Sequence, residues 1–152
     1  GVSSAASDVY KRQATERALR AAMAVAPDSA APAVTLAQRQ AAWGRTAAAF
    51  ATLDAFLARR PQDIAARAQY GRLAGSTGQQ LAKAERYLRE LTALPPWEVT
   101  QLRPSQATVH YRLGVVLAKA GRPAEARAAH QAALALDPGL KAAREALDAL
   151  RG

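Results

Sequence analysis

The chain has 152 residues, enough for one compact domain or one short helical array, and half of them are apolar. It has no cysteine, which excludes a disulfide or a thiolate metal site, and no apolar run approaches the roughly 18 residues that a membrane helix needs. The formal net charge is +9 at pH 7, but the arginines are scattered without a long block of like charge. We therefore do not expect nucleic acid as a partner.

Residues 1–13 differ in character from the rest of the chain. Residues 8–13, DVYKRQ, look like the translated end of an adapter used in sequencing libraries, and we interpret residues 1–13 as non-native. On this interpretation the chain is a bacterial metagenomic fragment, its native sequence begins near Ala14, and its true N-terminus is missing. A signal peptide or a further domain upstream stays open, and a cytoplasmic location is only the default.

The rest of the sequence predicts an all-α protein. Ala, Leu, Arg, Glu and Gln are strong helix formers, apolar residues recur at three- and four-residue spacing, and no segment alternates with the period of a strand. Glycine, proline and capping residues separate the predicted helices, which are residues 14–26, 32–43, 46–59, 64–74, 79–94, 106–120, 123–136 and 141–150.

The breaks between these helices recur at fixed spacing. Pro27, Pro61 and Pro95 are 34 residues apart, as are Gly44 and Gly78, whereas Gly78 to Gly121 and Pro95 to Pro138 are both 43 residues. A fixed period indicates a helical repeat with one nine-residue insertion. The predicted parts are a half repeat (14–29), three repeats (30–63, 64–97 and 107–140), the insertion (98–106) and a C-terminal capping helix (141–152).

The middle repeat fits this period least well. Lys83 and Glu90 fall where the period requires small or apolar residues. A slip of one residue in the second helix would instead bury Ala84, Leu88 and Leu91. In the insertion, we expect Trp97, Val99 and Leu102 to fold back onto neighbouring helices.

The last repeat resembles a tetratricopeptide repeat, a helix–turn–helix unit of about 34 residues. The resemblance is carried by Leu113-Gly114, Leu117, Gly121, Ala126, Ala133 and Pro138. It departs at His110 and His130, where the family often has aromatic residues. The resemblance implies an α-solenoid, in which antiparallel helix pairs stack into a superhelix and the first helix of each pair lines a concave groove.

The resemblance also implies where a partner would bind. The groove positions carried over from the family are Val34, Gln38, Ala68, Arg72, Tyr111, Val115 and Lys119, with Ala41, Gly75 and Thr108 beside them. The Lys/Asn/Arg set with which some members clamp a C-terminal carboxylate is absent. We therefore expect a protein or peptide partner, of acidic character, held between the two cations and Tyr111.

No arrangement of residues predicts catalysis. The serines after residue 13 lie in turns or caps, and there is no nucleophile elbow or phosphate-binding loop. His110 and His130 have too few possible co-ligands for a metal site, so we predict that they are packing residues and that no cofactor binds. We expect a non-enzymatic interaction module. The alternative is the accessory region of a larger bacterial enzyme, of sulfotransferase, hydroxylase or sulfatase type, or a scaffold in envelope or secretion assembly.

Overall fold

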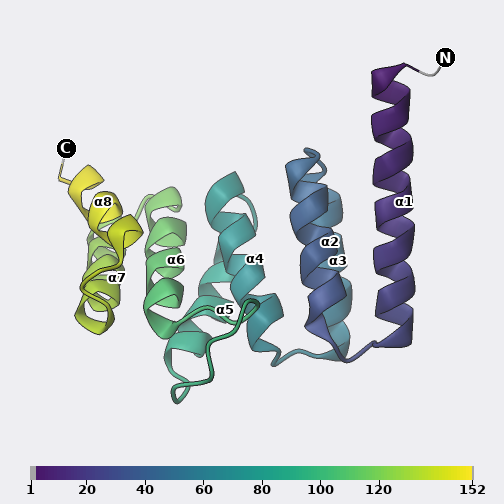
Figure 1. Ribbon diagram of the computed structural model, residues 1–152. Coiled ribbons are helices and arrows are strands. Elements are labelled where there is room, and N and C mark those ends of the chain that lie inside the picture. The colour runs from purple at the N-terminus through teal and green to yellow at the C-terminus, as the bar shows by residue number, and fades with distance from the viewer. Residues whose placement is uncertain (1–2, 152) are drawn as a thin grey trace. The chain divides into compact units, whose positions relative to one another are not determined.

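The computed structural model describes residues 3–151, and these residues form eight α-helices and no strand (Figure 1). The all-α prediction is therefore confirmed for this part of the chain. The helices are α1 (Ser4–Val25), α2 (Ala30–Ala42), α3 (Thr46–Arg59), α4 (Ile64–Thr77), α5 (Leu81–Thr92), α6 (Gln106–Lys119), α7 (Pro123–Leu136) and α8 (Lys141–Ala149).

The helices form two compact units, which divide after Pro61. In the first unit, α2 packs against both α1 and α3. In the second unit, α4 pairs with α5 and α6 pairs with α7, while α6 also packs against α4 and α5 and α8 follows α7. Packing between consecutive helices is consistent with a helical repeat. Among the described residues, no helix is both long enough and apolar enough to span a bilayer.

Glycine closes the first helix of each pair, as predicted. Gly44, Gly78 and Gly121 have φ angles of 77°, 72° and 76°, in the left-handed region that favours glycine. Around Gly44 and Gly121 the backbone makes the same two hydrogen bonds. The glycine N–H donates to the carbonyl three residues earlier, and the N–H of the next residue donates to the carbonyl five residues earlier, which belongs to Gln40 in one turn and to Leu117 in the other. This pattern is a Schellman motif, and it turns the chain directly into the second helix.

The one-residue slip in the middle repeat has a structural cause in its turn. The second helix starts two residues after Gly44 and Gly121, but three residues after Gly78. The extra residue places Gln80 at a φ of 55°, the one non-glycine residue with positive φ in residues 3–151. As predicted, Ala84, Leu88 and Leu91 are then buried.

Two helix boundaries were predicted wrongly at this turn. We expected a turn over residues 75–78, but α4 continues to Thr77 before Gly78 caps it, and the next helix, α5, begins at Leu81 instead of at residue 79. The hydroxyls of Ser76 and Thr77 donate to the carbonyl of Leu73, one turn earlier, so these turn-favouring residues are accommodated inside the helix.

Close helix packing in the second unit requires two further glycines. A Cβ atom on Gly114 would lie within 3.0 Å of the ring of His130, and one on Gly71 would lie equally close to the side chain of Leu88. Both partner side chains are fully or almost fully buried. The first and second helices of each pair therefore meet through a glycine.

A similar ion cluster occurs in each unit. Glu16 accepts from Arg20 and Arg45 at 2.9 Å, and Glu85 accepts from Arg89 at 2.8 Å and from Arg122 at 2.6 Å. Arg45 and Arg122 are the residues that follow the turn glycines. Each cluster thus joins a second helix to the turn of the next helix pair.

These bonds also change the acidity of the two glutamates. The pKa of Glu16 is lowered chiefly by its bond to Arg45, and the pKa of Glu85 chiefly by its bond to Arg122. The carboxylates are therefore held in the charged form that the clusters require.

The insertion forms a loop closed by its own hydrogen bonds. The indole N–H of Trp97 donates to the carbonyl of Pro104 at 2.8 Å, and the Thr100 hydroxyl accepts from the N–H groups of Leu102 and Arg103. Trp97 and Leu102 are partly buried, as expected for residues that fold back. The prediction for Val99 is wrong, because its side chain is 59% exposed beside the turn at Thr100.

The N-terminal helix is longer than predicted. Its cap is Ser3, whose hydroxyl accepts from the N–H of Ala6, and it includes most of the segment interpreted as non-native. On its native part, Leu19 and Met23 are half-buried, whereas Ala18 and Ala22 are exposed. Residues 1–2 of that segment, and residue 152 of the predicted cap, lie outside the described residues.

The contact between Gly114 and His130 can be tested by Gly114→Ala. The added methyl group would overlap the buried imidazole, and overpacking of this kind typically costs about 1–3 kcal/mol. We expect the free energy of unfolding to fall by that amount, measured by urea titration with Trp97 fluorescence in a Trp43→Phe background. Gly139→Ala is the control, because its nearest neighbour beyond adjacent residues is 3.5 Å away. Equal stability of the two variants would contradict the packing described.

Candidate functional site

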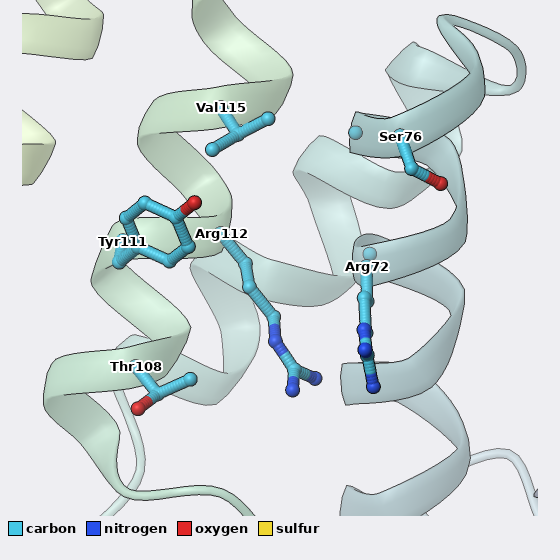
Figure 2. Close-up of a pocket in the computed structure, with 8 residues that line it drawn as sticks. Arg72, Ser76, Thr108, Tyr111, Arg112 and Val115 are labelled. Atoms are coloured by element: carbon cyan, nitrogen blue, oxygen red, sulfur yellow. The ribbon is translucent and has the colours of Figure 1, made fainter. Parts of the chain in front are cut away.

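A pocket of about 390 Å³ lies between α4 and α6, the first helices of the two pairs in the second unit (Figure 2). Its volume is within the range of small ligand sites. Its lining combines two arginines, three hydroxyl side chains, one valine and two glycines: Gly71, Arg72, Gly75, Ser76, Thr108, Tyr111, Arg112 and Val115.

The glycines of α4 allow α6 to approach closely beside this pocket. A Cβ on Gly75 would lie 2.9 Å from Cγ1 of Val115, so a larger residue would push α6 away. On the α6 side, the ring of Tyr111 lies 5.6 Å from the buried ring of His130. Tyr111 is therefore packed on its inner side against His130 of α7.

Arg112 is the most distinctive residue of the pocket. Its guanidinium donates to the carbonyl of Ala68 on α4 at 2.9 Å, so it reaches across from one first helix to the other. Burial, and to a smaller extent the nearby charge of Arg72, lower its pKa to about 10. Figure 2 shows the two arginine side chains side by side between α4 and α6.

No acidic residue lines the pocket to balance these two charges. Another buried arginine of the same unit provides a contrast, because Arg67 is bonded to the Glu90 carboxylate at 2.6 Å. Among the described residues, neither Arg72 nor Arg112 has such a carboxylate partner. The pocket therefore carries a concentrated positive charge, and Tyr111 lies beside it.

The structure brings some of the groove positions named from the sequence together, including Gly75 and Thr108, and separates others from them. Arg72, Tyr111 and Val115 line the pocket. Lys119 is exposed at the end of α6, at four-residue spacing from Val115 and so on the same face of that helix. Gln38 is also exposed, but it belongs to the first unit.

Two predicted groove residues have no accessible surface for a partner. Val34 is only 2% exposed, because α2 is covered by both α1 and α3. Ala68 is fully buried, because α4 is covered by both α5 and α6, and only its carbonyl takes part in the site. The family pattern placed both on a first helix, but the number of neighbours around that helix decides whether such a position is exposed.

Arg112 was missed by the sequence analysis. It is adjacent to Tyr111 and one turn from Thr108, so helical spacing alone could have placed it near the groove. Nothing in the sequence distinguishes it from the other scattered arginines, since its special feature is burial without a carboxylate. Ser76 and Gly71, the other unpredicted lining residues, are identified only by the packing of α4 against α6.

The two histidines differ in their burial. His130 is almost fully buried as a packing residue, as predicted, and His110 is partly buried. Burial lowers the pKa of both imidazoles. Among the described residues, no group of three or more His, Asp or Glu side chains could hold a metal ion.

Comparison with known proteins gives no family for this chain. No protein-family model matches the sequence, and no curated protein matches it. The structure establishes an all-helical domain whose helices pack in consecutive pairs.

The buried histidines predict a specific dependence of stability on pH. Their pKa values are lower in the folded protein than in the unfolded chain, so the unfolded chain binds more protons as the pH falls through about 6.5. The free energy of unfolding should therefore decrease from pH 7.5 to pH 5.5. In His130→Leu, which cannot be protonated there, the decrease should be smaller. Urea titrations at both pH values test this, and an unchanged decrease in His130→Leu would contradict it.

Proposed function

We propose that this chain is a tetratricopeptide-like repeat protein of the α-solenoid class and that it acts as a protein-interaction module. The consecutive helix pairs, the left-handed turn glycines and the two similar ion clusters support the repeat assignment. Repeats of this kind present the first helix of each pair to a partner. On this proposal the binding face lies on α4 and α6 of the second unit.

The pocket between α4 and α6 is the observation that carries this proposal. Arg72, Tyr111 and Val115, chosen from the sequence as groove residues, all line it. Aromatic and arginine side chains contribute a large part of the binding energy at many protein interfaces. The pocket thus has both an anchor for apolar groups and a source of charge attraction.

The charge of this face favours an acidic partner segment. Arg72 and Arg112 line the pocket, Lys119 continues the positive charge along α6, and no carboxylate lines the pocket. The whole chain also carries a formal charge of +9, which speeds the encounter with an acidic partner at low salt. The mechanism is the burial of a partner segment against Tyr111 and Val115, oriented by the cations.

Charge reversal on this face tests the proposal. Arg72→Glu with Lys119→Glu should abolish the binding of an acidic partner recovered by affinity capture, because two attractions become repulsions. Both side chains are exposed, so helical content measured by circular dichroism should not change. The matched control is Arg127→Glu with Arg144→Glu, which makes the same charge change on α7 and α8. Equal affinity of the wild-type chain and the Arg72/Lys119 variant would refute the proposal.

A further inference from the structure

We infer that Arg72 and Arg112 form an oxyanion-binding subsite that holds the side-chain carboxylate of an acidic residue in the partner segment. This inference rests on the proposed function, because the carboxylate is supplied by the partner. It assigns the specific contact to Arg112, a residue that the sequence alone did not identify.

The charge of the pocket is unbalanced. Arg112 is largely removed from water, its single bonded acceptor is a neutral carbonyl, and a second guanidinium lies beside it. Burial and, to a smaller extent, the like charge of Arg72 both disfavour the charged form of Arg112 in the free protein and lower its pKa. A bound anion would neutralise this charge and turn a repulsive pair into two attractive contacts.

Several hydrogen-bond donors of the pocket remain available for a ligand. Arg112 uses one N–H on Ala68, which leaves four of its five for a ligand. Thr108 accepts a hydrogen bond from Ser105, so its own hydroxyl hydrogen is not used in that bond. The Ser76 hydroxyl, by contrast, already donates to Leu73. Arginine matches the two oxygens of a carboxylate in a bidentate geometry, and a threonine hydroxyl at the pocket wall can add a further donor.

The pocket is larger than a small ion requires, and its positive surface continues along α6. A volume of about 390 Å³ corresponds to about a dozen water molecules, at roughly 30 Å³ each, and is much larger than one free carboxylate or phosphate. The apolar wall at Val115 can take the stem of an acidic side chain or its neighbour. Lys119 lies two helical turns beyond Tyr111 on the same face, about 12 Å at 1.5 Å per residue. A segment that passes through the pocket fits this surface better than a small ion.

The experiment uses the ¹⁵N-labelled full chain and short peptides with blocked termini. The probe is a seven-residue peptide with three central glutamates. Two comparison peptides replace these glutamates with glutamine: one has blocked termini, and the other has a free C-terminal carboxylate. Inorganic phosphate is titrated separately. Binding is measured from the NMR shifts of the arginine Nε–H groups at low and moderate salt.

The glutamate peptide should shift the signals of Arg72 and Arg112, with at least tenfold weaker binding in Arg112→Gln and in Arg72→Gln. Arg112→Lys should recover little affinity, because an ammonium group lacks the bidentate fork. Arg127→Gln, on α7, should bind as the wild type does. Urea titration of each variant verifies that it is folded, and Arg72→Gln, which changes an exposed side chain, keeps the test valid if Arg112→Gln does not fold.

Several results would overturn the inference. One is the absence of shifts at both arginines. Another is binding of either glutamine peptide, or of phosphate, that is as tight as binding of the glutamate peptide. A captured partner that depends on Arg72 and Lys119 but is unaffected by Arg112→Gln would refute the subsite and leave the proposed function intact. Peptide binding that depends on Arg112, together with a captured partner unaffected by charge reversal on this face, would refute the proposed function instead.

Discussion

In each helix pair of the second unit, the first helix contacts the second through a glycine: Gly71 lies against Leu88, and Gly114 lies against His130. The absence of a Cβ at these positions lets the second helix of each pair lie close behind the first, and a third glycine, Gly75, lets α4 approach Val115 of α6. The distance between the first helices, and therefore the width of the pocket between them, depends on the contact of Gly75 with Val115. A side chain at Gly75 would change the pocket without touching any of its charged groups.

The same close packing gives the arginines their properties. Because α4 and α6 are near each other, Arg112 can reach the Ala68 carbonyl, and it loses water in doing so. Elsewhere in this unit arginines meet glutamates, as in the cluster of Arg89 and Arg122 around Glu85. Those pairs balance charge locally and hold one helix pair to the next. The pocket differs in having no such balance, so its positive charge is available to attract an anion.

Much of the fold could be predicted from sequence because its signals are local. Turn glycines, prolines and apolar periodicity located the helices, and the misfit of Lys83 and Glu90 was enough to predict the slip that Gln80 causes. Exposure could not be predicted in the same way. Val34 and Ala68 occupy the expected helices but are covered by neighbours, and Arg112 differs from other arginines only in its surroundings. Burial and charge balance depend on packing between helices, which spacing along the chain does not contain.

The central claim is that Arg72 and Arg112 face each other in the free protein without a neutralising partner. A double-mutant cycle of Arg72→Gln and Arg112→Gln, measured by urea unfolding, isolates their interaction from their other contacts. We expect an unfavourable coupling energy at low salt, so that the double variant is less stable than the sum of the two single effects predicts, because the repulsion can be relieved only once; the coupling should be smaller at high salt because of screening. A coupling energy that is zero or favourable at low salt would contradict the account.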